Sequence, residues 1–145
     1  MTERLWMLDT DTSIELIRGQ RAWVQRRMDA VVADPGNRVA ISAIVNAELT
    51  YGLVRRAQRG MPQPAGDEFL KTVDTIPWDE RAAAKYGEVR VQLEMAGQLI
   101  GREDMTIAAH AIVLGATLVT NNVKHFVRLS PPLRMDNWVD PASDR

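Results

Sequence analysis

The chain has 145 residues, no cysteine and a formal net charge of −1, with 46% hydrophobic and 26% charged residues. This length suits one domain with a real core, and the composition excludes the disordered and fibrous classes. Without cysteine there are no disulfides, thiol nucleophiles or thiolate zinc sites, and the near-neutral charge gives no overall basic field that would indicate a nucleic-acid partner. No apolar run has the length of a membrane span, and the acids near the N-terminus are unlike a secretory signal. We expect a single domain over residues 1–145, with 140–145 as a flexible tail.

The first half of the chain alternates apolar runs with helical patterns. Residues 4–8 (RLWML) predict a strand buried on both faces, and the cap-forming residues 9–13 lead into a helical pattern from Ile14. Gly19 separates that helix from a second one over residues 20–33, and a turn at 34–37 precedes a short strand at 39–41. Ser42 is the expected N-cap of a helix that runs to residue 59, and residues 60–66 predict a surface loop.

The second half continues the same alternation. It predicts a short helix at 67–73, a brief strand at 75–76, a long helix at 79–97, a helix at 104–115, a strand at 117–120 and a last strand within 134–139. Short strands alternating with helices favour the α/β class, with a short, mainly parallel central sheet flanked by helices on both faces. Right-handed crossovers then place a ligand cleft beyond the carboxyl ends of the strands.

Acids and amides stand where an apolar residue or a plain loop is expected. Asp9 directly follows the first strand, where it either faces the cleft or caps the next helix. Asp104 opens a helix whose small residues allow close approach to the sheet, and a charge at this position also suits the helix dipole. Asn121 and Asn122 follow the strand at 117–120, and an isolated Asn pair after a strand indicates a turn.

A helical wheel places Glu48 on an apolar face. Its direction is shared with five apolar neighbours, Ile44, Val45, Ala47, Leu49 and Tyr51. We therefore predict that Glu48 lies on the buried face, where an ionised carboxylate costs on the order of several kcal/mol unless it is paired or metal-bound. A buried salt bridge to an arginine is the alternative to a metal site.

Three acids directed into one cleft repel one another unless divalent cations neutralise them. Carboxylate, amide and water oxygens suit Mg²⁺ or Mn²⁺, and the chain has no histidine cluster or thiol set that would prefer zinc. Hydrolysis of a phosphodiester by metal-activated water requires such a site. The joint pattern of Asp9, Glu48, Asp104 and Asn122 therefore predicts metal-dependent phosphodiester hydrolysis.

Four segments, in order along the chain, resemble PIN-domain ribonucleases, and most of all the VapC toxins of bacterial type II toxin–antitoxin pairs. They are residues 7–11 (MLDTD), 41–43 (ISA) with Glu48 and Leu49, 100–101 (IG) with Asp104 and 107–111 (IAAHA), and 118–122 (LVTNN) with Phe126. The resemblance implies a single PIN domain in the bacterial cytoplasm that acts as an endoribonuclease with Mg²⁺, for which Mn²⁺ substitutes. It also implies a homodimer, an RNA substrate, a cognate VapB-type antitoxin that inhibits the enzyme, and operator DNA bound only through the antitoxin complex.

The same resemblance implies roles for individual residues. Asp9, Glu48 and Asp104 would be the metal-binding acids, and we assign the ion itself to Asp9 and Asp104. Asn122 would take the fourth catalytic place, which is often an Asp in the family, and Thr120 would be the supporting hydroxyl just before it.

Three positions leave alternatives open. Because Asn122 is neutral, a second metal ion is expected to bind weakly or only with RNA present. His125 stands where many relatives carry Glu, so the resemblance gives it no role; it either touches an RNA phosphate or is an exposed loop residue. Asp11 either supports the metal through a water or caps and orients the following helix, and we favour capping.

Other residues have structural interpretations beside functional ones. We expect His110 to be a half-buried structural residue rather than a general base. Trp6 is expected in the core, whereas Trp23, Trp78 and Trp138 suit the core, a dimer interface or an antitoxin groove. A basic rim for RNA, or simply solvated helix faces, would be formed by Arg18, Arg21, Arg26, Arg27, Arg55, Arg56 and Arg59.

Two other functions compete with the nuclease. Residues 6–12 (WMLDTDT) also fit a haloacid-dehalogenase-type phosphatase, with Asp9 as nucleophile and Asp11 as general acid. That family needs an acidic pair just beyond a buried strand, whereas Glu103 and Asp104 are predicted to open a helix. A non-catalytic module that binds an antitoxin and DNA is the other alternative, and the intact acidic set argues against it.

Overall fold

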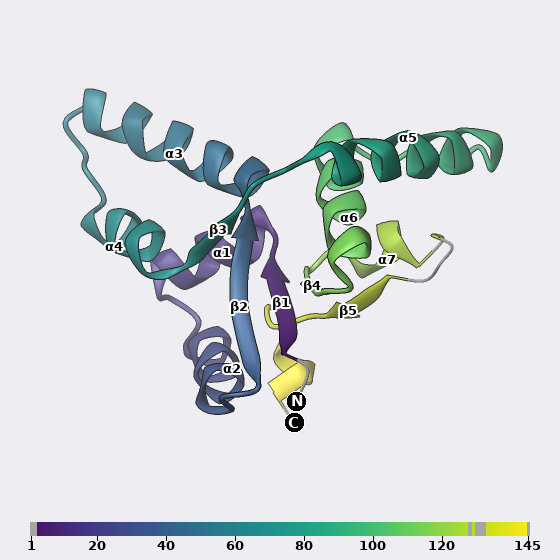
Figure 1. The fold of residues 1–145 in the computed structure, drawn as a ribbon. Helices are drawn as coiled ribbons and strands as arrows, with labels where there is room; N and C mark the ends of the chain where they lie inside the picture. The colour runs from purple at the N-terminus through teal and green to yellow at the C-terminus, as the bar shows by residue number, and fades with distance from the viewer. Residues whose placement is uncertain (1–2, 128, 130–132, 145) are drawn as a thin grey trace.

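The protein is a three-layer α/β domain built on one parallel sheet (Figure 1). The computed structural model describes residues 3–127, 129 and 133–144. The five strands are β1 (Arg4–Leu8), β2 (Asn37–Ser42), β3 (Asp74–Ile76), β4 (Thr117–Val119) and β5 (Arg134–Asp136). Their order is β3-β2-β1-β4-β5, and all four neighbouring pairs are parallel, so the predicted fold class is confirmed.

Helices cover both faces of this sheet. One side carries α1 (Thr10–Arg18), α2 (Ala22–Ala33), α3 (Ala43–Gln58) and α4 (Pro64–Thr72), and the other carries α5 (Glu80–Met95), α6 (Arg102–Leu114) and the single turn α7 (Val123–Phe126) (Figure 1). The 3₁₀ turn η1 (Pro141–Asp144) follows β5 and lies near α2, and the flexibility predicted for 140–145 stays a prediction. Among the described residues, no helix combines the length and the apolar character that a membrane span needs.

The strand order creates a switch point between β1 and β4. From β1 the chain moves outward to β2 and β3, and it then crosses to the other side of β1 to form β4 and β5. The register pairs Leu8 with Val119, so the carboxyl ends of β1 and β4 lie level with each other. Ligands of open parallel sheets bind at such a point, where successive connections leave on opposite faces.

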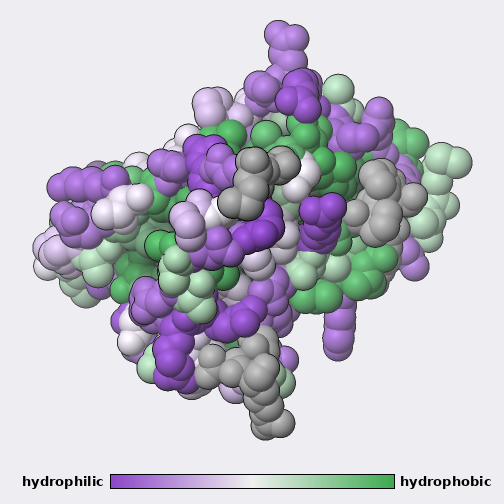
Figure 2. Space-filling view, turned by 60° about the horizontal axis from the view of Figure 1, so that its bottom comes forward, coloured by the Kyte–Doolittle hydropathy of each residue, from purple (hydrophilic) through white to green (hydrophobic). Residues whose placement is uncertain are grey.

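The core is formed by the sheet's central strands and the inner faces of the helices. Met7, Leu8, Ile41 and Leu118 are fully buried, as expected for strands covered on both sides. On the face around the chain termini, hydrophilic residues surround separate hydrophobic areas (Figure 2). The buried hydrophobic residues form one cluster, which includes residues of β1, β2 and β4 and of the helices on both faces.

All four tryptophans belong to the fold. Trp138 is completely buried and packs on Trp6, with ring centroids 6.3 Å apart. The indole of Trp23 donates a hydrogen bond to the Val139 carbonyl, and that of Trp78 donates one to the Thr106 carbonyl. These contacts within the chain support the prediction that the tryptophans serve the packing of the fold.

The predicted elements are present, with boundary changes that have local causes. The first helix begins at Thr10 rather than Ile14, because the Asp9 side chain accepts from the Thr12 amide and caps it. Helix α4 begins at Pro64, inside the predicted loop at 60–66. Proline suits the first position of a helix, because the N–H of that residue has no acceptor within the helix and its absence costs nothing. Helix α7 was not predicted, and β5 ends at Asp136, before the predicted limit of 139.

Candidate active site

The strand-to-helix junction after β1 fixes Asp9 at the switch point. Asp9 is only 5% exposed; its backbone N–H donates to the Val119 carbonyl at 3.0 Å and its Oδ1 accepts from the Thr12 amide at 2.8 Å. Burial raises the pKa of Asp9 above its ordinary value, and the nearby Asp11 charge adds to this, while hydrogen bonds from Thr12 and Thr120 partly offset it. Asp9 is therefore both the helix cap and a costly buried anion, so the two predicted roles coexist.

A small acidic pocket of about 100 Å³ opens beside Asp9. It is lined by the ends of β1 and β4 and the first turn of α6, through Asp9, Thr10, Asp11, Glu103, Asp104, Ile107 and Asn122. The structure thus brings together Asp9, Asp104 and Asn122 as predicted. Asp11 also lines the pocket, but the predicted capping role is wrong for it, because Asp9 caps α1 and Asp11 lies in the first helical turn.

Asn122 enters the pocket from the turn after β4. Its backbone N–H donates to the Thr120 hydroxyl at 3.0 Å, and Thr120 is fully buried. The same hydroxyl side chain hydrogen-bonds to Asp9. Thr120 therefore connects the end of β4 to Asp9, which agrees with the supporting role predicted for it.

Asp104 lies in the first turn of α6, as predicted, with its small neighbours Ala108 and Ala111 completely buried. Its side chain is 26% exposed, and its Oδ2 lies 3.3 Å from Nδ1 of His125 on α7. His125 is exposed, as one of its two predicted alternatives has it, but it lies on α7 beside Asp104 and not in a loop.

Glu103 is a site residue that the sequence analysis did not assign. Its Oε1 accepts from the Thr10 hydroxyl at 2.9 Å, which joins α6 to the start of α1. Burial raises the pKa of Glu103, and the charges of Glu48, Asp104 and Asp11 raise it further. The signal was an acid adjacent to Asp104, but nothing in the sequence shows that both acids of this turn face one pocket.

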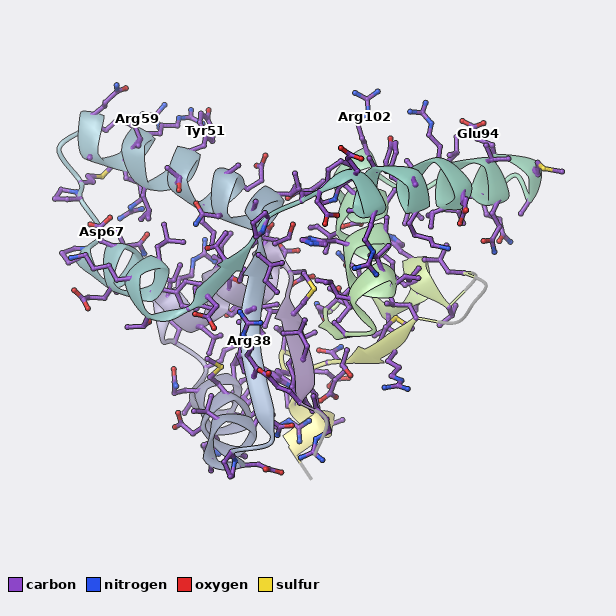
Figure 3. The ribbon with its side chains drawn as sticks, viewed as in Figure 1. Arg38, Tyr51, Arg59, Asp67, Glu94 and Arg102 are labelled. Atoms are coloured by element: carbon purple, nitrogen blue, oxygen red, sulfur yellow. The ribbon has the colours of Figure 1, made fainter. Side chains whose placement is uncertain are left out.

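The predicted burial of Glu48 is wrong. The residue is exposed, and within the described part of the chain its carboxylate makes no hydrogen bond or ion pair, so the alternative buried salt bridge is also absent there. Helix α3 extends beyond the sheet, and Tyr51 on it is 62% exposed, so its apolar side is only partly covered. Figure 3 shows Tyr51 projecting from α3 away from the rest of the molecule.

Glu48 instead borders a second, larger cavity. This α1–α3 groove has a volume of about 380 Å³ and an apolar floor that includes Ile14, Ile17, Leu49 and Leu53. Four of the predicted rim arginines, Arg18, Arg55, Arg56 and Arg59, line it. No salt bridge is formed by these four within the described residues, whereas Arg21 pairs with Glu15 and Arg27 with Asp136. Glu48 thus lies between the acidic pocket and the basic groove, and its charge raises the pKa of Glu103 in the pocket.

His110 is a structural residue, as predicted, but it is fully rather than half buried. Its Nδ1 lies 2.9 Å from Oγ of Ser42, which caps α3 at the end of β2. Burial lowers the pKa of His110 below its ordinary value. A neutral imidazole therefore fastens α6 to the carboxyl end of β2.

The pocket's donor set fits Mg²⁺ or Mn²⁺. All its polar side chains present oxygen or amide groups, and the carboxylates of Asp9, Asp11, Glu103 and Asp104 gather there. Within the described residues, no three Asp, Glu or His side chains converge closely enough to enclose an ion by themselves. Mg²⁺ keeps several of its waters and needs only one or two carboxylates, so an open ring of acids suits it better than a closed cage would.

Comparisons with known proteins show the family to which this chain belongs. The model of the PIN domain family matches residues 6–130. Ribonuclease VapC2 of Rickettsia felis is 37% identical over 134 residues, and the match covers 92% of this chain and 98% of the relative. The tRNA(fMet)-specific endonuclease VapC of Salmonella typhimurium is 30% identical over 133 residues, and this match covers 92% of this chain and 97% of the relative. The crystal structure of VapBC2 from Rickettsia felis bound to a promoter DNA fragment superposes with a TM-score of 0.82 at 36% identity, covering 92% of this chain and 98% of that one. The chain therefore belongs to the PIN-domain family and, within it, to the VapC ribonucleases.

Proposed function

We propose that this protein is a toxin of a type II toxin–antitoxin pair that hydrolyses RNA internally in a Mg²⁺- or Mn²⁺-dependent reaction. The observation that carries the proposal is the acidic pocket at the switch point of the sheet, where buried Asp9 and half-buried Asp104 lie beside Asn122. Membership of the PIN-domain family, relatives named as ribonucleases and a pocket that gathers carboxylate and amide oxygens together support this activity.

Asp9 and Asp104 are the residues that would hold the ion, which supplies an activated water and neutralises charge on phosphate oxygens. The remaining groups orient these two carboxylates: Thr12 and Thr120 hydrogen-bond to Asp9, and α6 holds Asp104 at its positive N-terminal end. In the hydrolysis this site would support, the water oxygen loses a proton and bonds to phosphorus, while the bond from phosphorus to the 3′ oxygen breaks and that oxygen takes up a proton. The products carry a 5′-phosphate and a 3′-hydroxyl, unlike those of attack by the ribose 2′-hydroxyl.

The α1–α3 groove supports a role for the basic rim. Its four arginines place positive charge next to the acidic pocket although the whole chain is slightly acidic. We propose that RNA, single-stranded or looped so that its bases can be splayed out, contacts this rim through its phosphates.

A VapB-type antitoxin is the proposed partner, because the similar Rickettsia felis toxin was crystallised as VapBC2 with promoter DNA. We propose inhibition by a basic antitoxin side chain that occupies the metal position, with operator DNA bound only through the complex. A homodimer in the bacterial cytoplasm completes the proposal. Inhibition that survives replacement of every basic residue near the antitoxin's toxin-binding end would contradict the inhibition mechanism.

The phosphatase alternative is less compatible with the site. Glu103 and Asp104 open helix α6 instead of following a strand, and Asp11 lies in the first turn of α1 beside a second acid, Glu103, rather than alone as a general acid. The non-catalytic alternative leaves unexplained why four carboxylates gather in one pocket, where their like charges repel one another.

The test is cleavage of a mixed RNA by purified protein with Mg²⁺, with Mn²⁺ and with a chelator, beside the Asp104→Asn variant. Metal-dependent cutting that Asp104→Asn abolishes, with 5′-phosphate ends, is expected and would exclude a contaminating nuclease. Absence of cutting with either metal across total cellular RNA would reject the proposal, and release of phosphate from a small phosphate ester would favour the phosphatase.

A further inference from the structure

His125 on α7 is held beside Asp104 by contacts that do not depend on a ligand. The turn begins at Asn122, whose N–H is tied to the Thr120 hydroxyl, and the His125 N–H donates to the Asn122 carbonyl at 3.0 Å. Phe126, the next residue, is buried in the core, and its ring meets the His125 ring edge to face with centroids 6.4 Å apart. The imidazole is therefore anchored on both sides of its own position in the chain.

The contact between His125 and Asp104 has a defined direction. A carboxylate only accepts, so the Nδ1 atom of His125 donates to Oδ2 of Asp104 across 3.3 Å. Within the described residues this is the hydrogen bond that the Asp104 side chain accepts. It involves Oδ2, so the other carboxylate oxygen, Oδ1, does not take part in it. Asp9, by contrast, is oriented by Thr12 and Thr120, so each of the two carboxylates has its own supporting donor.

We infer that His125 is a positioning residue, which fixes the rotamer of Asp104 so that its free oxygen faces the acidic pocket. This inference rests on the proposed metal-dependent function. Asp104 lies in the first turn of α6, and its side chain is 26% exposed. Without the imidazole its carboxylate would therefore sample other rotamers, and ion binding would have to restrict them at an entropic cost. Groups that orient a ligating carboxylate change metal affinity by about 10- to 100-fold when they are removed.

The experiment is calorimetric titration of Mn²⁺ into RNA-free protein for the wild type, His125→Ala, His125→Asn and Val127→Ala. His125→Ala is expected to weaken Mn²⁺ binding about tenfold. His125→Asn is expected to restore most of the affinity, because its amide nitrogen lies where Nδ1 does and can donate. Val127 is 64% exposed directly after the same turn, so Val127→Ala is the matched control and is expected to bind as the wild type does.

Cleavage kinetics separate this role from a direct RNA contact. For His125→Ala we expect a lower kcat at limiting Mn²⁺ that recovers at saturating Mn²⁺, with KM for RNA unchanged. Unchanged Mn²⁺ affinity in His125→Ala would overturn the inference, and if KM rose at the same time His125 would be an RNA-contacting residue. A wild type that neither binds Mn²⁺ nor cleaves RNA would overturn the proposed function as well, whereas a wild type that does both, with His125→Ala unaffected, would overturn the inference alone.

Discussion

Asp9 and Glu48 are both acids of the same proposed site, yet their surroundings are opposite. Asp9 is 5% exposed at the end of a central strand, with its backbone and side chain both hydrogen-bonded. Glu48 is exposed on a helix that extends past the sheet, with no hydrogen-bonding partner in the described residues. Strand ends therefore supply the preorganised, desolvated part of the site, and α3 supplies an adjustable charge at its border.

The largest effect that tests this contrast is on catalysis. Asp9→Asn removes a buried anion that would hold the ion, so we expect cleavage to fall by about 10³-fold, corresponding to roughly 4 kcal/mol. Glu48→Gln alters only a bordering charge, and we expect a loss of about 10- to 100-fold. Rates measured at saturating metal check both values. Equal losses would contradict the contrast and would mean that α3 closes onto the pocket when substrate binds.

The next effect concerns the carboxyl end of β2, where His110 on α6 contacts Ser42, and it is measured as a change in the free energy of unfolding. His110→Ala removes the buried imidazole and its contact with Ser42, and we expect the free energy of unfolding to fall by about 1–3 kcal/mol. The pKa of His110 is lowered in the folded protein, so its stabilising contribution is complete above the unfolded-state pKa of about 6.5 and is lost as pH falls through the lowered folded value. Urea denaturation of both proteins between pH 8 and 5 should show a steeper loss for the wild type. Parallel curves would show that His110 does not titrate on unfolding.

An effect of similar size links the acidic pocket to stability. If Mg²⁺ binds the folded state only, a concentration about 100-fold above its Kd raises the free energy of unfolding by about 2.7 kcal/mol and Tm by about 5–10 °C. Asp9→Asn should abolish this shift and Glu48→Gln should keep most of it. Calorimetric scans in chelator and in millimolar Mg²⁺ measure it, and a wild type with no shift would count against a metal site in the free protein.

The same contrast explains what could be predicted from the sequence. Asp9, Thr120 and Asn122 follow buried apolar strands directly, and parallel strands bring their carboxyl ends to one edge whatever the loops do. The fold class and this half of the site could therefore be predicted from local patterns and topology.

The helical half of the site could not be predicted equally well. A helical wheel shows which side of α3 is apolar, but not that the helix extends past the sheet and leaves Tyr51 and Glu48 uncovered. Glu103 and Asp104 are separated by about 100° on α6, and only the approach of Thr10 from α1 brings Glu103 into the pocket. These features depend on how elements distant in sequence pack against each other.

The smallest expected effect isolates the cost of the buried Asp9 charge. In metal-free buffer Asp9→Asn keeps a cap acceptor for the Thr12 amide and removes an anion whose pKa is raised by burial, so we expect it to be more stable than the wild type by about 1 kcal/mol. Because the folded pKa of Asp9 lies above its unfolded value, the wild type begins to recover this stability as pH falls through the folded pKa, and the difference should vanish below pH 3.8. Asp9→Ala, which lacks the cap, should instead be less stable than Asp9→Asn by about 1 kcal/mol at every pH. Urea titrations of the three proteins in chelator measure these differences. A stability difference between the wild type and Asp9→Asn that does not change with pH would show that capping, and not charge burial, decides the stability of this junction.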